Sequence, residues 1–339
     1  MANGFLALDI LPSRLTAGIA TAEGQIVMRD RIATPQRNVW PAVIQLVRRV
    51  IAANSTGVVA QAIGVTCPGP IDRATGSMKP FGLPEWHGFP LRRELSEMFG
   101  LPVEIDTAGR GLALAEVWIG ETSRRSRNDQ NVAALVASDE VDGGLIIKGR
   151  LAQGTMMNAG QFGHIIVEPE GVECQCGAVG CLSAYVGSRS IQMSTGRDLR
   201  RTPPAIVERT GIMLARACAS IAAMFDVSDI VVGGVVPLAL GPDLFVAVQH
   251  ELDQRSRLAH LGELRVRGVA RLGPLVGAAA VAHDADLIAR DGADDESSTG
   301  QTRSVWTPKV LTDDADLGAR VRIISPDSAP GDGVDNPAG

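Results

Sequence analysis

Aromatic residues, long apolar runs and basic clusters are all scarce in this sequence. Phe, Trp and Tyr make up only 4% of its 339 residues. No apolar run approaches the ~18–20 residues of a membrane helix. The first residues, Met-Ala-Asn-Gly, lack the basic segment and apolar core of a signal peptide. These absences argue against a membrane partner and predict a cytoplasmic protein. The hydrophobic content of 45% is ample for a sizeable core and excludes a largely disordered chain.

Net charge is concentrated at one end of the chain. The formal charge is −6, and residues 291–339 contain ten acidic and four basic residues. Subtracting these from the totals of 38 and 32 leaves 28 acidic and 28 basic residues in residues 1–290. A neutral body without a basic stripe argues against nucleic-acid binding. We expect residues 291–339 to be an acidic, disordered tail.

Cysteine usage points to a metal rather than to disulfides. The five cysteines are an odd number in a chain without a signal peptide. Three of them cluster with one histidine within 18 residues, as His164, Cys174, Cys176 and Cys181. One imidazole and three thiolates make a complete tetrahedral set for a structural zinc, with no open position for catalysis. The alternative is three buried free cysteines and a hydrogen-bonded histidine.

Strand-like and helix-like patterns alternate along the chain. A first series has three short strands, an amphipathic helix, two further strands and an Ala/Leu-rich helix, over residues 5–10, 15–20, 26–31, 39–53, 62–66, 103–106 and 112–119. A second series has strands at 132–136, at 144–147 and from 151 onward, and its layout echoes that of residues 5–31. It is followed by helices at 205–225, 242–257 and 275–289 and strands at 230–232 and 264–270. This alternation favours a two-lobed α/β fold.

These motifs resemble those of the ROK family of bacterial sugar kinases and sugar-responsive repressors, within the actin/hexokinase superfamily. The resemblance covers residues 5–290 and rests on the zinc segment, on Gly64-Val65-Thr66-Cys67-Pro68-Gly69-Pro70, on Leu83-Pro84-Glu85-Trp86, and on Ile230-Val231-Val232-Gly233-Gly234. It implies an actin-like ATPase (hexokinase/ribonuclease-H-like) fold with a structural zinc loop at 163–182. A small lobe would span 1–110 and a large lobe 111–274, with a helix over 275–290 packing back on the small lobe.

The resemblance also implies a place for each ligand. The nucleotide would lie against Asp9, Ser13, Arg14, Gly233 and Gly234. The sugar would lie against Gln161, His164 and Trp86, with His164 also a zinc ligand. Relatives are commonly dimers, so a homodimer is expected. Members that bind DNA carry an added N-terminal helix-turn-helix, for which the strand starting at Phe5 leaves no room.

The position of the family's catalytic base carries alanine in this sequence. The family pattern Asn-Asp-Ala-Asn falls on residues 107–110, because the flanking segments align without a gap. The base therefore falls on Ala108, which cannot accept a proton. Asp106 lies two residues upstream, displaced by about 6–7 Å along an extended strand. A base must lie within about 3 Å of its proton or one water away, so Asp106 is a weak substitute.

The phosphate loops and the sugar side also depart from the family pattern. The family's Asp-x-Gly-Gly-Thr-Lys is Asp9-Ile10-Leu11-Pro12-Ser13-Arg14 here, and Pro12 offers no N–H to a phosphate. The family's Gly-Thr-Gly is Ser138-Asp139-Glu140, whose two carboxylates would repel a triphosphate. On the sugar side, the family's two Glu and one Asn are Gln161, Ser183 and Gly82.

These losses beside a retained scaffold favour a catalytically inactive protein that acts as a sugar-binding, regulatory or scaffold protein. Zinc is then the expected cofactor, while binding of ATP and magnesium is doubtful. The alternative is a divergent ATP-dependent sugar kinase that phosphorylates a hexose or an N-acetylhexosamine.

Overall fold

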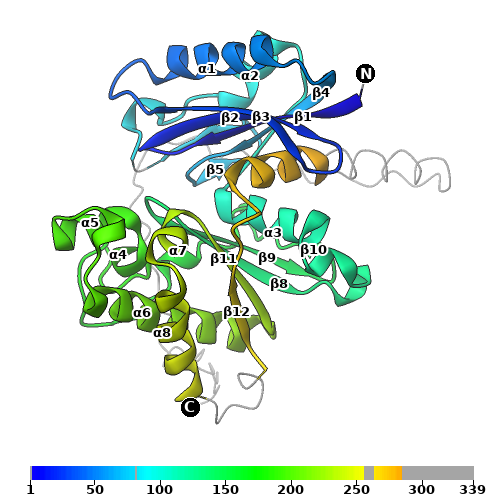
Figure 1. Ribbon diagram of the computed structural model, residues 1–339. Helices are drawn as coiled ribbons and strands as arrows, with labels where there is room; N and C mark the ends of the chain where they lie inside the picture. Colours follow the sequence, from blue (N-terminus) through cyan, green and yellow to red (C-terminus); the bar gives the residue numbers. More distant parts are fainter. Residues whose placement is uncertain (1, 81, 256–262, 285–339) are drawn as a thin grey trace, which may run out of the picture. The chain divides into compact units, whose positions relative to one another are not determined.

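Two α/β lobes, each built on a five-stranded mixed sheet, make up the described part of the chain (Figure 1). The computed structural model describes residues 2–80, 82–255 and 263–284. The predicted two-lobed α/β class is confirmed. The predicted tail, residues 291–339, and the last residues of the helices predicted at 242–257 and 275–289 lie outside the described residues.

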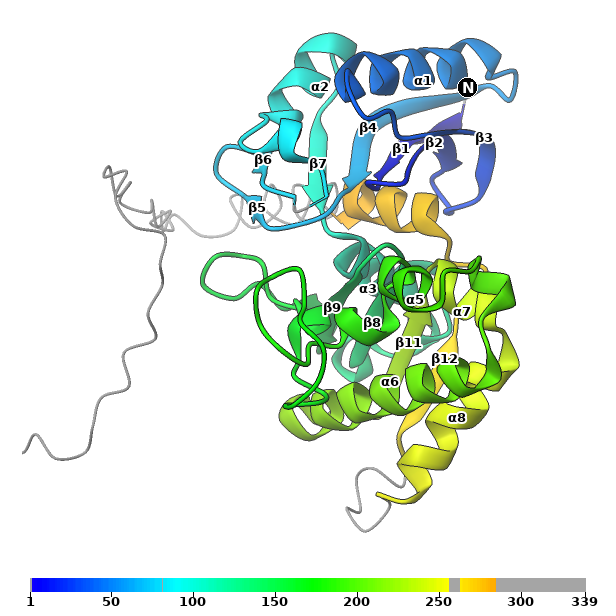
Figure 2. The ribbon, with the colours of Figure 1, turned by 90° about the vertical axis from the view of Figure 1, so that its left-hand side faces the viewer.

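The N-terminal sheet has the strand order β3-β2-β1-β4-β7. Its strands are β1 (Ala2–Ile10), β2 (Arg14–Thr21), β3 (Ile26–Ala33), β4 (Val58–Thr66) and β7 (Val103–Asp106). The first three form an antiparallel meander, and β4 and β7 extend it in parallel. Helices α1 (Val39–Ala53) and α2 (Leu91–Phe99) lie on one side of this sheet (Figure 2). The predicted strands and the helix at 39–53 are confirmed.

The C-terminal sheet repeats this topology with the order β10-β9-β8-β11-β12. Its strands are β8 (Val132–Ala137), β9 (Val141–Ile147), β10 (Arg150–Leu151), β11 (Asp229–Gly233) and β12 (Arg265–Gly268). Again a three-stranded antiparallel meander is followed by two parallel strands. The predicted echo between the two strand series is therefore a shared sheet topology.

Helices and short elements connect these strands. The α-helices of the C-terminal lobe are α3 (Ala108–Ile119), α4 (Ser183–Val186), α5 (Ser188–Thr195), α6 (Pro204–Phe225), α7 (Val235–Leu240) and α8 (Pro242–Asp253). The minor elements are β5 (Ile71–Asp72), β6 (Ser77–Met78) and the 3₁₀ helices η1 (Pro84–Trp86), η2 (Thr122–Arg124), η3 (Arg127–Asp129), η4 (Phe162–His164) and η5 (Leu199–Arg201). Within the described ranges, no helix combines the length and apolar character needed to cross a bilayer.

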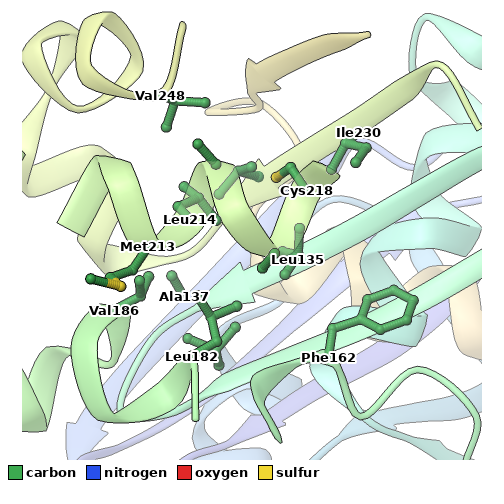
Figure 3. Packing of buried hydrophobic residues seen from close by; sticks show 14 of the residues in the cluster. Leu135, Ala137, Phe162, Leu182, Val186, Met213, Leu214, Cys218, Ile230 and Val248 are labelled. Atoms are coloured by element: carbon green, nitrogen blue, oxygen red, sulfur yellow. The ribbon is translucent and has the colours of Figure 1, made fainter. Parts of the chain in front are cut away.

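Each lobe has its own aliphatic core. In the C-terminal lobe, Leu214 and Cys218 on α6 pack with Leu135 on β8 and Ile230 on β11 (Figure 3). In the N-terminal lobe, α1 buries Val43, Val47 and Val50 against the sheet, as their helical spacing predicts. Cys67 is buried in that second core. Cys67 and Cys218 are core residues, as expected.

Helical residues 274–284 contribute to two further clusters that involve both lobes. Leu275 and Ala278 pack with Phe5 and Ala7 of β1. Val276 and Ala280 of the same helical stretch pack with Leu112 of α3 and Val231 of β11. The approach to the N-terminal sheet requires glycine, because a Cβ atom at Gly64 would lie 1.9 Å from the Ala278 carbonyl oxygen.

Candidate functional site

Two adjoining cavities lie where the carboxyl ends of β1 and β11 face the β8–β9 turn. The larger has a volume of about 780 Å³ and is lined by Asp9, Arg14, Gly233 and Gly234, among others. The smaller has a volume of about 60 Å³, and Gln161 and His164 contribute to its wall. Their common wall consists of Leu11, Ala108, Val136 and Ser138. The larger cavity is within the size range of small-molecule and cofactor sites.

Asp9 places a buried carboxylate at the end of β1, facing the larger cavity. The Thr66 hydroxyl donates a hydrogen bond of 2.8 Å to its Oδ1. Its Oδ2 is buried and has no hydrogen-bond partner among the described residues. Burial raises the pKa of Asp9 to about 6, against the opposing charge of Arg14. An unpaired buried carboxylate oxygen is suited to a ligand that brings a cation or a donor.

Gly233 ends β11 and Gly234 follows it, both at the same cavity. Gly234 has a φ of 104°, and a Cβ atom there would lie 2.2 Å from the Ala137 carbonyl oxygen. Only glycine fits this backbone, which brings the main chain to the cavity surface. The structure therefore brings together four of the five residues predicted for the nucleotide side.

The fifth, Ser13, bonds to Asp139 of the β8–β9 turn instead of lining the larger cavity. Its N–H donates to Asp139 Oδ2 at 2.9 Å and its hydroxyl donates to Asp139 Oδ1 at 2.7 Å. The two turns predicted to hold phosphate thus bind each other. Gly82 is part of the same change, because a Cβ atom there would lie 2.4 Å from Pro12 Cγ. The departures from the family pattern at Pro12 and Gly82 are therefore sterically coupled: any larger residue at position 82 would clash with the Pro12 ring.

Ala108 begins α3 and lies on the common wall of both cavities. The weak substitute Asp106 is engaged elsewhere. Its Oδ1 accepts hydrogen bonds from Arg110 Nε at 2.7 Å, from the Thr107 N–H at 2.7 Å and from Arg73. Arg110 is only 1% exposed, so this ion pair is buried. Both guanidinium groups pair with the Asp106 carboxylate, and Asp106 is absent from the walls of both cavities.

Arg110, at one of the family's asparagine positions, organises the neighbouring loop. Its Nη1 donates to the carbonyl oxygens of Ala152 and Ala159, and its Nη2 donates to Gln153 Oε1 at 2.8 Å. The buried guanidinium thereby ties residues 152–159 to the start of α3. Its role in the fold is structural.

Asp142 is the cavity residue that the sequence analysis missed. It lies on β9 opposite Val136 and lines the smaller cavity. Its Oδ2 accepts a 2.8 Å hydrogen bond from the Gly109 N–H, the residue after Ala108. Burial raises the pKa of Asp142 to about 6, although hydrogen bonds from Gly109, Thr107 and Gly143 oppose that shift. The sequence offers no motif for this position, and only the packing of β9 against α3 reveals it.

The four predicted zinc ligands come together beside the smaller cavity. The ligand atoms of His164, Cys174, Cys176 and Cys181 all lie within 4.8 Å of one another. Cys176 and Cys181 Sγ are 3.7 Å apart, and Cys174 Sγ is 4.0 Å from His164 Nδ1. Thiolates arranged tetrahedrally about 2.3 Å from a zinc ion lie about 3.8 Å apart. The cluster therefore fits a structural zinc site.

The local sequence explains this arrangement. Glu173 and Val179 form an antiparallel bridge, as do Ile166 and Cys181, so the segment folds into a small hairpin. Gly180 has a φ of 81°, and a Cβ atom there would lie 1.9 Å from the Glu168 carbonyl oxygen. Burial lowers the pKa of His164, which favours the neutral imidazole that binds metals.

The other residues predicted to bind sugar lie in two different places. Gln161 lines the smaller cavity, next to Gly69. Trp86 is 2% exposed, stacks on Phe89 at a ring-centroid distance of 4.9 Å, and belongs to the N-terminal core. It is not part of the wall of either cavity, so its contact with a sugar stays a prediction. Ser183 donates to the Val141 carbonyl oxygen and accepts from the Val141 N–H at 3.1 Å.

Comparison with known proteins adds family and fold. The sequence matches the model of the ROK family over residues 5–285. It is 29% identical to a glucokinase of Thermotoga maritima over 188 residues, which is 55% of this chain and 58% of that enzyme, less than two thirds of its length. It is 29% identical to an N-acetylmannosamine kinase of Shigella boydii over 252 residues, 70% of this chain and 84% of that enzyme. The crystal structure of a ROK hexokinase from Thermus thermophilus superposes with a TM-score of 0.68 at 26% identity, covering 85% of this chain and 100% of the other.

Proposed function

The chain belongs to the ROK family, and from that membership we propose that it is a sugar kinase that transfers a phosphoryl group from ATP to a hexose or an N-acetylhexosamine. The relatives named as kinases of glucose and of N-acetylmannosamine support this substrate class. The loss of the family's base at Ala108 had favoured an inactive protein. The relatives and the geometry of the cavities support the kinase more strongly.

The observation that carries the proposal is the common wall of the two cavities. Phosphoryl transfer needs a donor and an acceptor in line, with little covalent work for the protein. A nucleotide in the larger cavity, near Asp9, Arg14 and Gly234, would direct its terminal phosphate toward the wall at Ala108 and Ser138. A sugar near Gln161 and His164 would approach the same wall from the other side. The smaller cavity, at about 60 Å³, must widen to admit a hexose.

The structural zinc supports the acceptor side. His164 lines the smaller cavity and also belongs to the metal cluster. Zinc held by His164, Cys174, Cys176 and Cys181 would fix the segment that contains both the ligands and Gln161. With four protein ligands the ion has no position for substrate, so its role is to orient this loop.

The test is ADP release by the purified full-length protein over a panel of hexoses and N-acetylhexosamines, with ATP and with polyphosphate as donors. We expect sugar-dependent turnover with at least one sugar. Absence of transfer with every sugar and donor contradicts the proposal. Chromatography with light scattering on the same preparation tests the proposed homodimer.

A second candidate function, a sugar-binding protein without kinase activity, is favoured by the bond between Ser13 and Asp139. That bond occupies two donors in the first phosphate loop with a carboxylate of this chain. Calorimetry with sugars and nucleotides added separately distinguishes the two functions. Binding of a sugar but of no nucleotide, without turnover, supports the second.

A further inference from the structure

Asp142 places a carboxylate at the start of α3, where it bonds to Gly109, the residue after Ala108. It comes from β9, the strand that packs against this helix, and its Oδ2 accepts from the Gly109 N–H at 2.8 Å. A carboxylate oxygen on the first N–H groups of a helix is a stable arrangement, because those groups have no partner within the helix. The anchored oxygen fixes the side chain beside Ala108 at the wall of the smaller cavity.

The other oxygen of Asp142 is available to a ligand. Oδ1 is shielded from solvent and makes no hydrogen bond of normal length among the described residues. The nearby Thr107 hydroxyl, which also lacks such a bond, lowers the pKa of this carboxylate. An acceptor left in this state costs about 1–3 kcal/mol, which a donor from a bound molecule would remove. In the smaller cavity, the only donor-rich molecule that the proposed function brings is the sugar. An acceptor hydroxyl is therefore the natural partner of Oδ1.

Two other carboxylates of this region are already engaged, while Asp9 faces the larger cavity. Asp139 accepts both donors of Ser13. Burial and the charge of Asp139 raise the pKa of Glu140, and the charge of Arg189 opposes that shift. Asp106 is held by Arg73 and Arg110. Of the three acidic residues that line the smaller cavity, Asp142 is the one with a buried oxygen that lacks a partner among the described residues.

We propose that Asp142 accepts the proton of the sugar hydroxyl during phosphoryl transfer, a role that the methyl group of Ala108 cannot perform. This inference rests on the proposed function. The hydroxyl oxygen bonds to the terminal phosphorus of ATP as the bond from that phosphorus to the bridging oxygen of ADP breaks. The hydroxyl proton passes to Asp142 Oδ1 and then to solvent. The products are the sugar phosphate, ADP and one proton.

The raised pKa of Asp142 suits this role. At about 6 it lies close to neutral pH, where a group is both ionised and basic enough to take a proton. Burial is the main cause, and the nearby charge of Asp106 adds to it. The hydrogen bond from Gly109 keeps the charged form accessible.

The experiment compares Asp142→Asn with the wild type in sugar phosphorylation. The amide retains an oxygen for the Gly109 N–H but cannot accept the proton. We expect kcat to fall about 10²–10⁴-fold while KM for the sugar stays within about threefold. The rise of kcat/KM between about pH 5 and 7 in the wild type should also disappear. Asp253→Asn, on the exposed end of α8, is the matched control and should change neither quantity.

A second variant separates proton transfer from structural support. Adding Ala108→Asp to Asp142→Asn returns a carboxylate to the start of α3 and should restore kcat at least tenfold. A merely structural role of Asp142 would not be rescued in this way. Wild-type turnover with an unchanged kcat in Asp142→Asn overturns the role of Asp142 and leaves the proposed function standing. A wild type that phosphorylates no sugar overturns the proposed function and the proton transfer together.

Discussion

The Ser13 hydroxyl lies 2.7 Å from one oxygen of the Asp139 carboxylate, and the Ser13 N–H lies 2.9 Å from the other. The two residues come from the β1–β2 turn and the β8–β9 turn, which are the corresponding turns of the two similar sheets. The Asp139 carboxylate therefore accepts from two Ser13 donors that the family resemblance assigns to a phosphate. In the proposed kinase this carboxylate would compete with the nucleotide for the same groups.

Removing that carboxylate should improve nucleotide binding. We expect Asp139→Ala to tighten binding of a non-hydrolysable ATP analogue about fivefold, because an exposed charge contributes up to about 1 kcal/mol. Calorimetry at two salt concentrations measures the effect, which should shrink at high salt. Ser13→Ala, which removes the hydroxyl bond but keeps the N–H bond and the carboxylate, should not tighten binding. An equal gain in both variants would show that releasing the turns, and not removing the charge, is responsible.

Loss of the metal should destabilise the C-terminal lobe. We expect about one zinc per chain, and Cys174→Ser should abolish metal retention and lower the free energy of unfolding by several kcal/mol. Metal analysis and urea unfolding measure the two effects. Cys218→Ala is the matched control, since Cys218 is buried in the core of the same lobe. It should destabilise the lobe while leaving the metal content unchanged, and zinc retained in Cys174→Ser would contradict the site.

Breaking the ion pair between Asp106 and Arg110 should be costly. Arg110 is 1% exposed and its Nε lies 2.7 Å from Asp106 Oδ1. Arg110→Ala leaves a buried carboxylate with one guanidinium fewer, and we expect a loss of about 3–5 kcal/mol of stability. Arg93→Ala, at a side chain 62% exposed that pairs with Glu94, should cost less than about 0.5 kcal/mol. Similar losses in both variants, measured by urea unfolding, would contradict the assignment of a structural role to Arg110.

Stability should depend on pH through Asp9. Its pKa of about 6 in the folded protein exceeds the ordinary value near 4, so the folded state binds this proton more tightly than the unfolded state. The stabilisation is complete below about pH 4 and is lost as the pH rises through 6. The free energy of unfolding of Asp9→Asn minus that of the wild type should be about 1–3 kcal/mol larger at pH 7.5 than at pH 4.

Urea unfolding at the two pH values measures this difference for Asp9→Asn. The control is Asp253→Asn, which removes an exposed carboxylate and should shift stability by less than about 0.5 kcal/mol at either pH. A pH-independent effect of Asp9→Asn would show that the Asp9 carboxylate titrates alike in the folded and unfolded chains.

Much of the fold could be predicted because its signals are local. The meander of β1, β2 and β3 follows from short apolar runs separated by turn residues, and α1 follows from valines at helical spacing. The alternation of these elements was enough for the two-lobed α/β class. The shared order of the two sheets was visible only as an echo, because strand order depends on pairing between distant segments.

The site was predicted unevenly for the same reason. The zinc ligands lie within 18 residues, so their spacing in the sequence reflects their proximity in space. The motif around Trp86 predicts a sugar contact. It does not reveal that the Trp86 ring stacks on Phe89 in the core. Asp142 carries no motif at all.

The sequence by itself determined the elements, the metal-binding set and the alanine at position 108, since each depends on residues close together along the chain. Only the tertiary structure decided which carboxylates are available. Asp139 meets Ser13 across 126 residues and Asp142 meets Gly109 across 33. Asp106 is held by Arg73 of its own lobe and by Arg110 in the first turn of α3. Whether a carboxylate is paired, anchored or open to a ligand depends on what the fold packs against it, and that decides its chemistry.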